Sequence, residues 1–96
     1  MKIRWLRKAL ENIEHEATYI SQENPAAANA VVQCIYDSAA LLADNPSLGH
    51  PGRIPDTREL VVPDTQYIIP YRVSSRLNQI EILRVFHTSR KPPKNW

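Results

Sequence analysis

Cysteine and glycine are both scarce in this chain of 96 residues. Its one cysteine excludes an internal disulfide. Cys34 stands in a largely apolar stretch, residues 31–35, which is typical of a small buried hydrophobic residue, so we expect it in the core. The two glycines, Gly49 and Gly52, are too few for a glycine-rich phosphate-binding loop. Disulfide-stabilised folds and nucleotide-binding loops are therefore excluded.

Long apolar runs are missing as well. The sequence contains no stretch of about 18 apolar residues, so we expect no membrane span. The first residues, MKIRWLRKALENIEHE, are charged throughout and lack the apolar region of a secretory signal. Hydrophobic residues make up 43% and charged residues 23%, which is ordinary for a globular protein. We expect a cytoplasmic, bacterial protein with a single domain over residues 1–96.

Positive charge is absent from a long central stretch. Residues 11–44 hold six acids and no lysine or arginine, which gives this stretch a net charge of −6. The rest of the chain holds all twelve bases and four acids, which gives it +8. Such segregation predicts a basic face that meets an anionic or acidic partner.

A strand and two helices are predicted for the first half. Alternating side chains in residues 2–5 predict a short strand with Ile3 and Trp5 on one face. Steps of three and four then predict a helix that ends near residues 22–24, with an apolar stripe formed by Leu6, Leu10, Ile13, Ala17 and Ile20.

A second helix follows almost at once. Asn24 suits the N-cap and Pro25 the first helical position, and Asn45-Pro46 ends the helix. The short link makes the two helices an antiparallel hairpin. The apolar stripe of the second helix is Ala28, Val31, Ile35, Ala39 and Leu42.

Three strands are predicted after a loop at residues 46–57. They cover residues 58–62, 66–73 and 79–87, with turns at residues 63–65 and 74–78. Short turns make these neighbours antiparallel. Pro70 lies inside the middle strand, which predicts a bulge or an N–H position that points away from the ladder.

The resulting fold class is α+β with the order β-α-α-β-β-β. The helical hairpin packs on one face of a mainly antiparallel sheet. The right-handed crossover through the hairpin places the first strand beside the last strand and parallel to it.

Most catalytic classes find no support in the sequence. His15, His50 and His87 are far apart and lack the spacing of metal ligands. No serine stands in a nucleophile elbow, and Glu14 and Glu16 are not neighbours on one helix face. We therefore expect no metal and no cofactor.

Basic residues are the remaining candidates for function. Arg58, Arg72 and Arg84 lie on three successive strands, so they are expected to converge on the sheet face opposite the helices, beside Tyr67 and Tyr71. Such a face suits phosphate contacts and base stacking. It also suits RNA cleavage, in which arginines neutralise the phosphate and a histidine moves the proton. The alternative is a face that is solvated or paired with Glu59 and Glu81.

The chain resembles the RelE/ParE superfamily of toxins from bacterial type II toxin–antitoxin systems. The resemblance runs from Ile3 to Lys91 and depends on the order of the elements and on four segments: Gly52-Arg53, residues 57–60, residues 67–73, and residues 85–87 followed by Arg90. It implies growth arrest, plasmid stabilisation, neutralisation by a cognate antitoxin and a toxin–antitoxin hetero-oligomer.

The superfamily has two main activities. RelE-like members cut mRNA on the ribosome, whereas ParE-like members bind DNA gyrase and stall it without chemistry of their own. The nucleases carry a basic residue three positions before the tyrosine of the Tyr-x-Val strand, where this chain has Ile68. A closing His-x-x-Arg, His87 to Arg90, is nearer the ParE pattern. The resemblance thus favours a gyrase inhibitor, not an enzyme. The alternative is an mRNA endonuclease with Arg58, His87 and Arg90 as its catalytic residues.

A basic C-terminal tail, residues 88–96, is predicted to dock on the target. With the strands it gives the predicted target-binding set Arg58, Arg72, Arg84, His87, Arg90, Lys91, Lys94 and Trp96. A third hypothesis is an RNA-binding module or antitoxin-bound scaffold without toxicity. An acidic antitoxin segment is expected to cover the basic surface, fill the groove between hairpin and sheet, and pair with the sheet edge.

Overall fold

A computed structural model describes residues 1–89, and the last seven residues lie outside the described part. The chain begins with β1 (Lys2–Trp5), followed by α1 (Arg7–Ser21) and α2 (Pro25–Ala40). A single 3-10 turn, Leu41–Ala43, extends α2. Five strands follow: β2 (His50–Pro51), β3 (Arg58–Val61), β4 (Tyr67–Ser74), β5 (Gln79–Ile82) and β6 (Phe86–His87).

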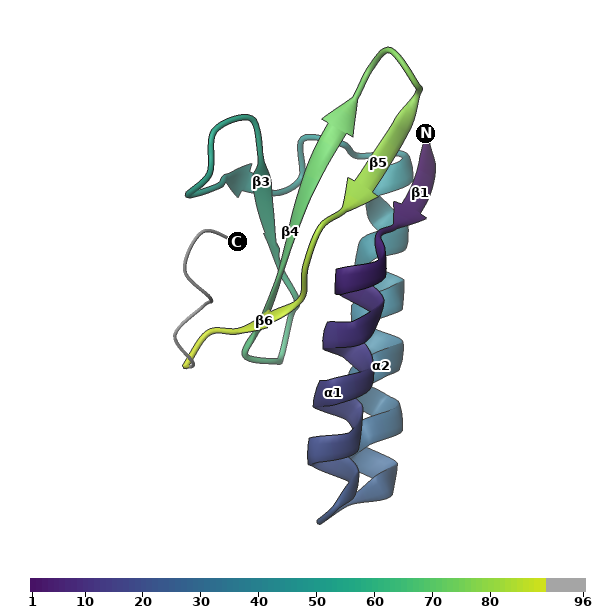
Figure 1. The fold of residues 1–96 in the computed structure, drawn as a ribbon, viewed down its shortest axis with the longest axis vertical. Helices are drawn as coiled ribbons and strands as arrows, with labels where there is room; N and C mark the ends of the chain where they lie inside the picture. The colour runs from purple at the N-terminus through teal and green to yellow at the C-terminus, as the bar shows by residue number, and fades with distance from the viewer. Residues whose placement is uncertain (90–96) are drawn as a thin grey trace.

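The predicted fold class is confirmed. Figure 1 shows the two helices running side by side as a hairpin next to the sheet. The sheet has the order β1-β5-β4-β3-β2, and β6 pairs with β4 beyond the end of β5. The strand β1 is parallel to β5, whereas the other pairs are antiparallel. The predicted place of the first strand is therefore confirmed.

The core lies between the hairpin and one sheet face. Alternation along β4 and β5 points one side chain in two toward the helices. The inward set meets small and branched residues from the helices, and the fully or almost fully buried core residues include Ala9, Ile35, Ala39, Leu42, Ile69, Tyr71, Ile80 and Ile82. Tyr67 is also in this core, so the prediction that Tyr67 and Tyr71 lie on the open face is wrong.

The buried stripe of α1 agrees with the prediction at Ile13 and Ile20 but differs from it at Leu10. Leu10 is 44% exposed, whereas Ala9 is fully buried, together with Ile13 and Glu16. Glu16 belongs to this stripe because its carboxylate accepts a hydrogen bond of 2.8 Å from the Tyr67 hydroxyl. A sequence pattern that counts only apolar residues does not place Glu16 on the buried face of α1, because Glu16 is an acid.

The second helix follows its prediction more closely. The Asn24 side chain accepts a hydrogen bond from the Ala27 N–H, and Pro25 stands in the first turn. Its stripe is buried or half-buried as expected. Cys34 is exposed, so its predicted burial is wrong, because the inward face of α2 passes through Ile35.

The segment Pro25–Ala43 is long and apolar enough to cross a membrane by length and composition alone. In this fold it packs against α1, and Ala28, Ile35 and Leu42 are buried in it. It therefore serves as the core helix of the α+β fold.

The predicted strand 79–87 is divided in two. The β4 residues opposite β5 are 71–74 and those opposite β6 are 67–68, so Pro70 faces the interruption. The Leu83 N–H donates to the Pro70 carbonyl at 2.9 Å. The N and C=O of one strand residue point to the same side, so the missing N–H of Pro70 also faces residues 83–85. The predicted irregularity exists, and it breaks the partner strand.

Both predicted turns after β3 are present. Asp64 and Asn78 have positive φ, 61° and 51°, which Asp and Asn tolerate better than other non-glycine residues. The strand β2 was not predicted, because its two residues, His50 and Pro51, stand between two glycines and carry no strand pattern.

Candidate functional site

Arg58 holds a loop. Its guanidinium donates to the Gly49 carbonyl at 2.6 Å and to the Ser47 carbonyl at 3.5 Å. Arg58 is opposite Tyr71 in the β3–β4 ladder, and directly opposite residues share a sheet face. It therefore lies on the helix side of the sheet, and the prediction that it joins Arg72 on the open face is wrong.

Tyr71 fixes the same loop from the core. Its hydroxyl donates to the Pro46 carbonyl at 2.7 Å and accepts from the Gly49 N–H at 2.9 Å. Burial raises the pKa of Tyr71 above 10.0, although the Gly49 hydrogen bond and the Arg58 charge oppose this shift. A Cβ at Gly49 would stand 2.7 Å from the Tyr71 ring, so only glycine lets the loop approach this closely. Segment 46–49 is thus fixed by four side-chain contacts.

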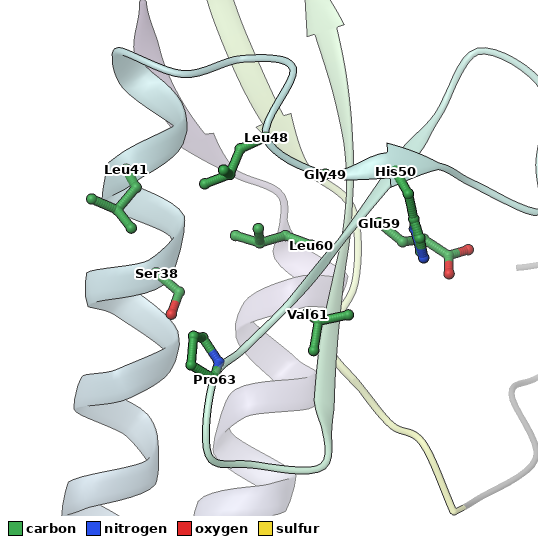
Figure 2. Close-up of a pocket in the computed structure, with 9 residues that line it drawn as sticks. All are labelled: Ser38, Leu41, Leu48, Gly49, His50, Glu59, Leu60, Val61 and Pro63. Carbon is green, nitrogen blue, oxygen red and sulfur yellow. The ribbon is translucent and has the colours of Figure 1, made fainter.

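This fixed segment forms one wall of an apolar groove. The groove encloses about 470 Å³ between the end of α2, residues 48–50 and β3. Figure 2 shows Leu48 and Leu60 directed toward the space between helix and strand, and Leu41 on the end of the helix also lines the groove. Leu41, Leu48 and Val61 are more than half exposed, at 55%, 51% and 56%. Large apolar side chains held open by a rigid loop are typical of a docking surface.

The strand β3 offers a free edge beside this groove. Within residues 1–89, β2 pairs with Arg58 and Glu59 and leaves the outer side of Leu60 and Val61 without a strand partner. An open edge next to apolar side chains can accept one more strand from a partner.

The open sheet face carries a charged row that the sequence only hinted at. Arg4 on β1 is opposite Glu81 on β5, and Glu81 is opposite Arg72 on β4. Arg72 donates two hydrogen bonds to the Glu81 carboxylate, at 2.9 and 2.7 Å. Lys2 lies on the same face, one step along β1. Lys2 and Arg4 were not among the predicted site residues, although the alternation in residues 2–5 was the signal that places them there.

His87 lies on the other side of the sheet from Arg72. It is opposite Tyr67 in the β4–β6 ladder, and the two rings meet edge to face at 5.1 Å. The Ser89 N–H donates to His87 Nδ1 at 3.2 Å, and the Ser89 hydroxyl is 2.7 Å from the same nitrogen. His87 is therefore held by a local turn and is half-buried.

Within residues 1–89, the predicted site residues do not converge. Their β4 partners, Tyr71 for Arg58 and Tyr67 for His87, are four residues apart, or about 13 Å along the strand. The Arg84 guanidinium donates to the carbonyl of Leu83, its own neighbour, at 2.8 Å. Arg90, Lys91, Lys94 and Trp96 lie outside the described residues. Ile68 is buried, at 7% exposure, beside Phe86 in the ladder.

The fold and its relatives define the class of protein. The chain resembles "Chromosomal ParDE TA system from P. aeruginosa" with a TM-score of 0.79 and 28% identity, over 91% of this chain and 95% of that chain. It shares its fold with a chain of the toxin–antitoxin complex RelBE2 of Mycobacterium tuberculosis, with a TM-score of 0.58, 22% identity, and coverage of 90% and 95%. The protein is thus a member of the RelE/ParE superfamily.

The sequence comparisons narrow this class to one family. The chain is 43% identical over 93 residues to "Putative toxin Y4kP" of Sinorhizobium fredii, which covers 97% of this chain and 94% of that protein. A family model described as the ParE toxin of type II toxin–antitoxin system, parDE, matches residues 3–92. The chain belongs to the family of ParE toxins.

Proposed function

We propose that the protein is a cytoplasmic toxin that binds DNA gyrase, stalls it and arrests growth until an antitoxin neutralises it. The observation that carries this proposal is the family match over residues 3–92. Plasmid stabilisation is the role that such a toxin–antitoxin pair would serve.

The geometry supports binding rather than RNA cleavage. A nuclease needs a proton carrier and a cation at one phosphate. Here the guanidinium of Arg58 is directed at loop carbonyls, and His87 lies about 13 Å further along β4. Ile68 is buried where the related nucleases carry a base. Arg58 and His87 are therefore poorly placed to act on the same phosphate.

A supercoiling reaction tests this proposal. Purified protein is added to gyrase with relaxed plasmid, and we expect supercoiling to be blocked or cleaved DNA to accumulate. The variant His87→Ala is expected to weaken this inhibition at most, because a binder needs no proton carrier. Normal supercoiling, together with cut mRNA on programmed ribosomes that His87→Ala abolishes, would show the protein to be a ribosome-dependent nuclease.

The antitoxin is the second proposed partner. We propose that its segment lies in the groove at Leu41, Leu48 and Val61 and adds a strand to the free edge of β3. One structural relative belongs to a ParDE toxin–antitoxin system and the other to the toxin–antitoxin complex RelBE2, which supports a cognate antitoxin for this chain and a hetero-oligomer of the two. The apolar lining requires apolar side chains on alternate positions of the incoming strand. A small acidic protein encoded immediately beside this gene would be the candidate.

A further inference from the structure

Exposed cations lie on the open face of the sheet and in the turn beside it. Lys2 and Arg4 are exposed on β1, whereas Ile3 and Trp5, between and after them, pack toward the core. Arg72 is exposed on β4 in the same ladder row as Arg4. Arg76 is exposed in the turn that joins β4 to β5. We call Lys2, Arg4, Arg72 and Arg76 the sheet-face cation patch.

The acids of this face do not cancel the patch. The Glu81 side chain is only 13% exposed and is bound by Arg72, whose own side chain is 49% exposed. Glu59, further along the face on β3, is paired with Arg53 at 3.1 Å. Within residues 1–89, no ion pair forms at Lys2, Arg4 or Arg76. Three cations are thus directed at solvent without a carboxylate of this part of the chain.

The acidic stretch, residues 11–44, lies on the opposite side of the core from the patch. The six acids of residues 11–44 belong to the hairpin and its end, and five of them are exposed. The hairpin packs on the core side of the sheet, opposite the open face. A polyanion is therefore attracted to the sheet face and repelled by the hairpin, which orients the molecule as it approaches.

The chemistry of the patch fits a nucleic acid better than an acidic protein. Its ladder neighbours Ser74, Gln79 and Glu81 are polar or charged, and the turn beside them carries one exposed large apolar side chain, Leu77. Protein–protein interfaces centre on apolar and aromatic anchors and are depleted of charge at the core. Protein–DNA interfaces are polar, strongly positive and dominated by phosphate contacts.

We propose that the sheet-face cation patch binds the sugar–phosphate backbone of double-stranded DNA without reading its sequence. Lys2 and Arg4 are two residues apart on one strand, or about 7 Å, so both can contact the backbone of one DNA strand, whose phosphates follow one another with a rise of about 3.4 Å along the helix axis. The contact itself follows from the patch. The choice of DNA over RNA rests on the proposed function, since gyrase holds a DNA duplex.

The test measures binding of the full-length protein to a short random-sequence DNA duplex as a function of salt. Each phosphate contact contributes about −0.9 to the slope of log K against log salt, so the three cations without a carboxylate partner predict a slope of about −3. Lys2→Gln with Arg4→Gln is expected to flatten the slope by about 2 and to weaken binding at low salt about tenfold or more.

A matched control separates the patch from net charge. Arg7→Gln with Lys8→Gln also removes one lysine and one arginine, from the exposed start of α1. This variant is expected to bind the duplex nearly as the unchanged protein does. Equal losses of affinity in both variants would show that binding depends on net charge and not on the patch, which would overturn the proposal. Absence of duplex binding at low salt would also overturn it.

Two further arms keep this proposal distinct from the proposed function. Poly-glutamate that competes as well as DNA, with the same loss in the Lys2/Arg4 variant, would assign the patch to an acidic protein and overturn the DNA contact. Tighter binding of an RNA duplex than of DNA would overturn the choice of DNA. The gyrase reaction reports on the toxin's target independently, because naked DNA binding needs no gyrase.

Discussion

Single residues of this protein connect the core to its surface. Tyr71 is fully buried on β4, yet its hydroxyl binds both the Pro46 carbonyl and the Gly49 N–H. Arg58 adds its own bond to the Gly49 carbonyl. The sequence marks Arg58 as a residue for target or substrate, both by its strand position and by the family resemblance. Its contacts make it a positioning residue for the loop.

The buried Tyr71 hydroxyl is expected to make the folded state less stable at alkaline pH, because it must be neutral to stay buried. Burial raises its pKa in the folded state. The stabilisation from the neutral form is complete below the pKa of about 10 that a tyrosine has in the unfolded chain, and it is lost as the pH rises through the higher folded value. Tyr71→Phe is expected to lower the free energy of unfolding at pH 7 by about 1–3 kcal/mol, because Pro46 and Gly49 lose their partner.

Denaturant unfolding at several pH values checks this expectation. The unchanged protein should lose stability above about pH 10, and Tyr71→Phe should show a smaller loss over the same range. Tyr36→Phe is the control, because this tyrosine is partly exposed, at 38%. Equal alkaline slopes in the unchanged protein and in Tyr71→Phe would contradict the role of the buried hydroxyl.

A pair of leucines tests which face of α1 is buried, with Leu42 in the turn that extends α2 as the buried reference. Leu42 is fully buried and Leu10 is 44% exposed. Leu42→Ala is expected to reduce the free energy of unfolding by about 2–5 kcal/mol, because it leaves a cavity in the core. Leu10→Ala is expected to change it by no more than about 0.5–1 kcal/mol. Similar losses in both variants would favour the stripe that the sequence predicted.

At the scale of elements, the interrupted strand and the fixed loop shape the proposed partner surface. The division of residues 79–87 into β5 and β6 follows from Pro70, which has no N–H to offer at that point of β4. The end of α2, segment 46–49 and β3 together form the groove. No single one of these elements forms the groove alone.

The groove gives a prediction with a built-in control. Leu48 and Leu77 are similarly exposed, at 51% and 58%, but only Leu48 lines the groove. Leu48→Glu is expected to weaken binding of the cognate antitoxin at least about tenfold, because it places a charge in an apolar contact. Leu77→Glu is expected to bind nearly normally. Calorimetric titration measures both affinities. Equal effects of the two substitutions would contradict the proposal that the antitoxin binds in this groove.

At the scale of the whole molecule, most of the negative charge lies in the helical layer and the cation patch lies on the sheet layer. The acidic stretch 11–44 becomes the hairpin layer and its end, and the sheet layer carries the patch on its open face. The segregation that sequence alone reveals along the chain is therefore also a segregation in space. It separates a proposed antitoxin groove at the edge of β3 from a cationic face beyond the sheet.

The tail belongs to this scale, because its proposed partner is another large molecule. Removing residues 90–96 deletes Arg90, Lys91, Lys94 and Trp96 but keeps the contacts of Thr88 with Gln66 and of Ser89 with His87. We expect an unchanged melting temperature and a loss of gyrase inhibition of at least about tenfold, because these cations are proposed to meet the target. Unchanged growth arrest on expression of the shortened protein would exclude the tail as a docking surface.

The sequence by itself determined the order of the main elements, the hairpin of helices and the parallel place of β1, because these follow from periodicity, capping and the handedness of crossovers. It also pointed to the toxin superfamily, since the segments that carry the resemblance are local. Only the tertiary structure decided which residues meet. Arg58, Arg72 and His87 lie on neighbouring strands, but the register placed Arg58 and His87 on the helix side and Arg72 on the open face. A shift of one residue along a strand exchanges its two faces, and the register depends on contacts across the whole sheet.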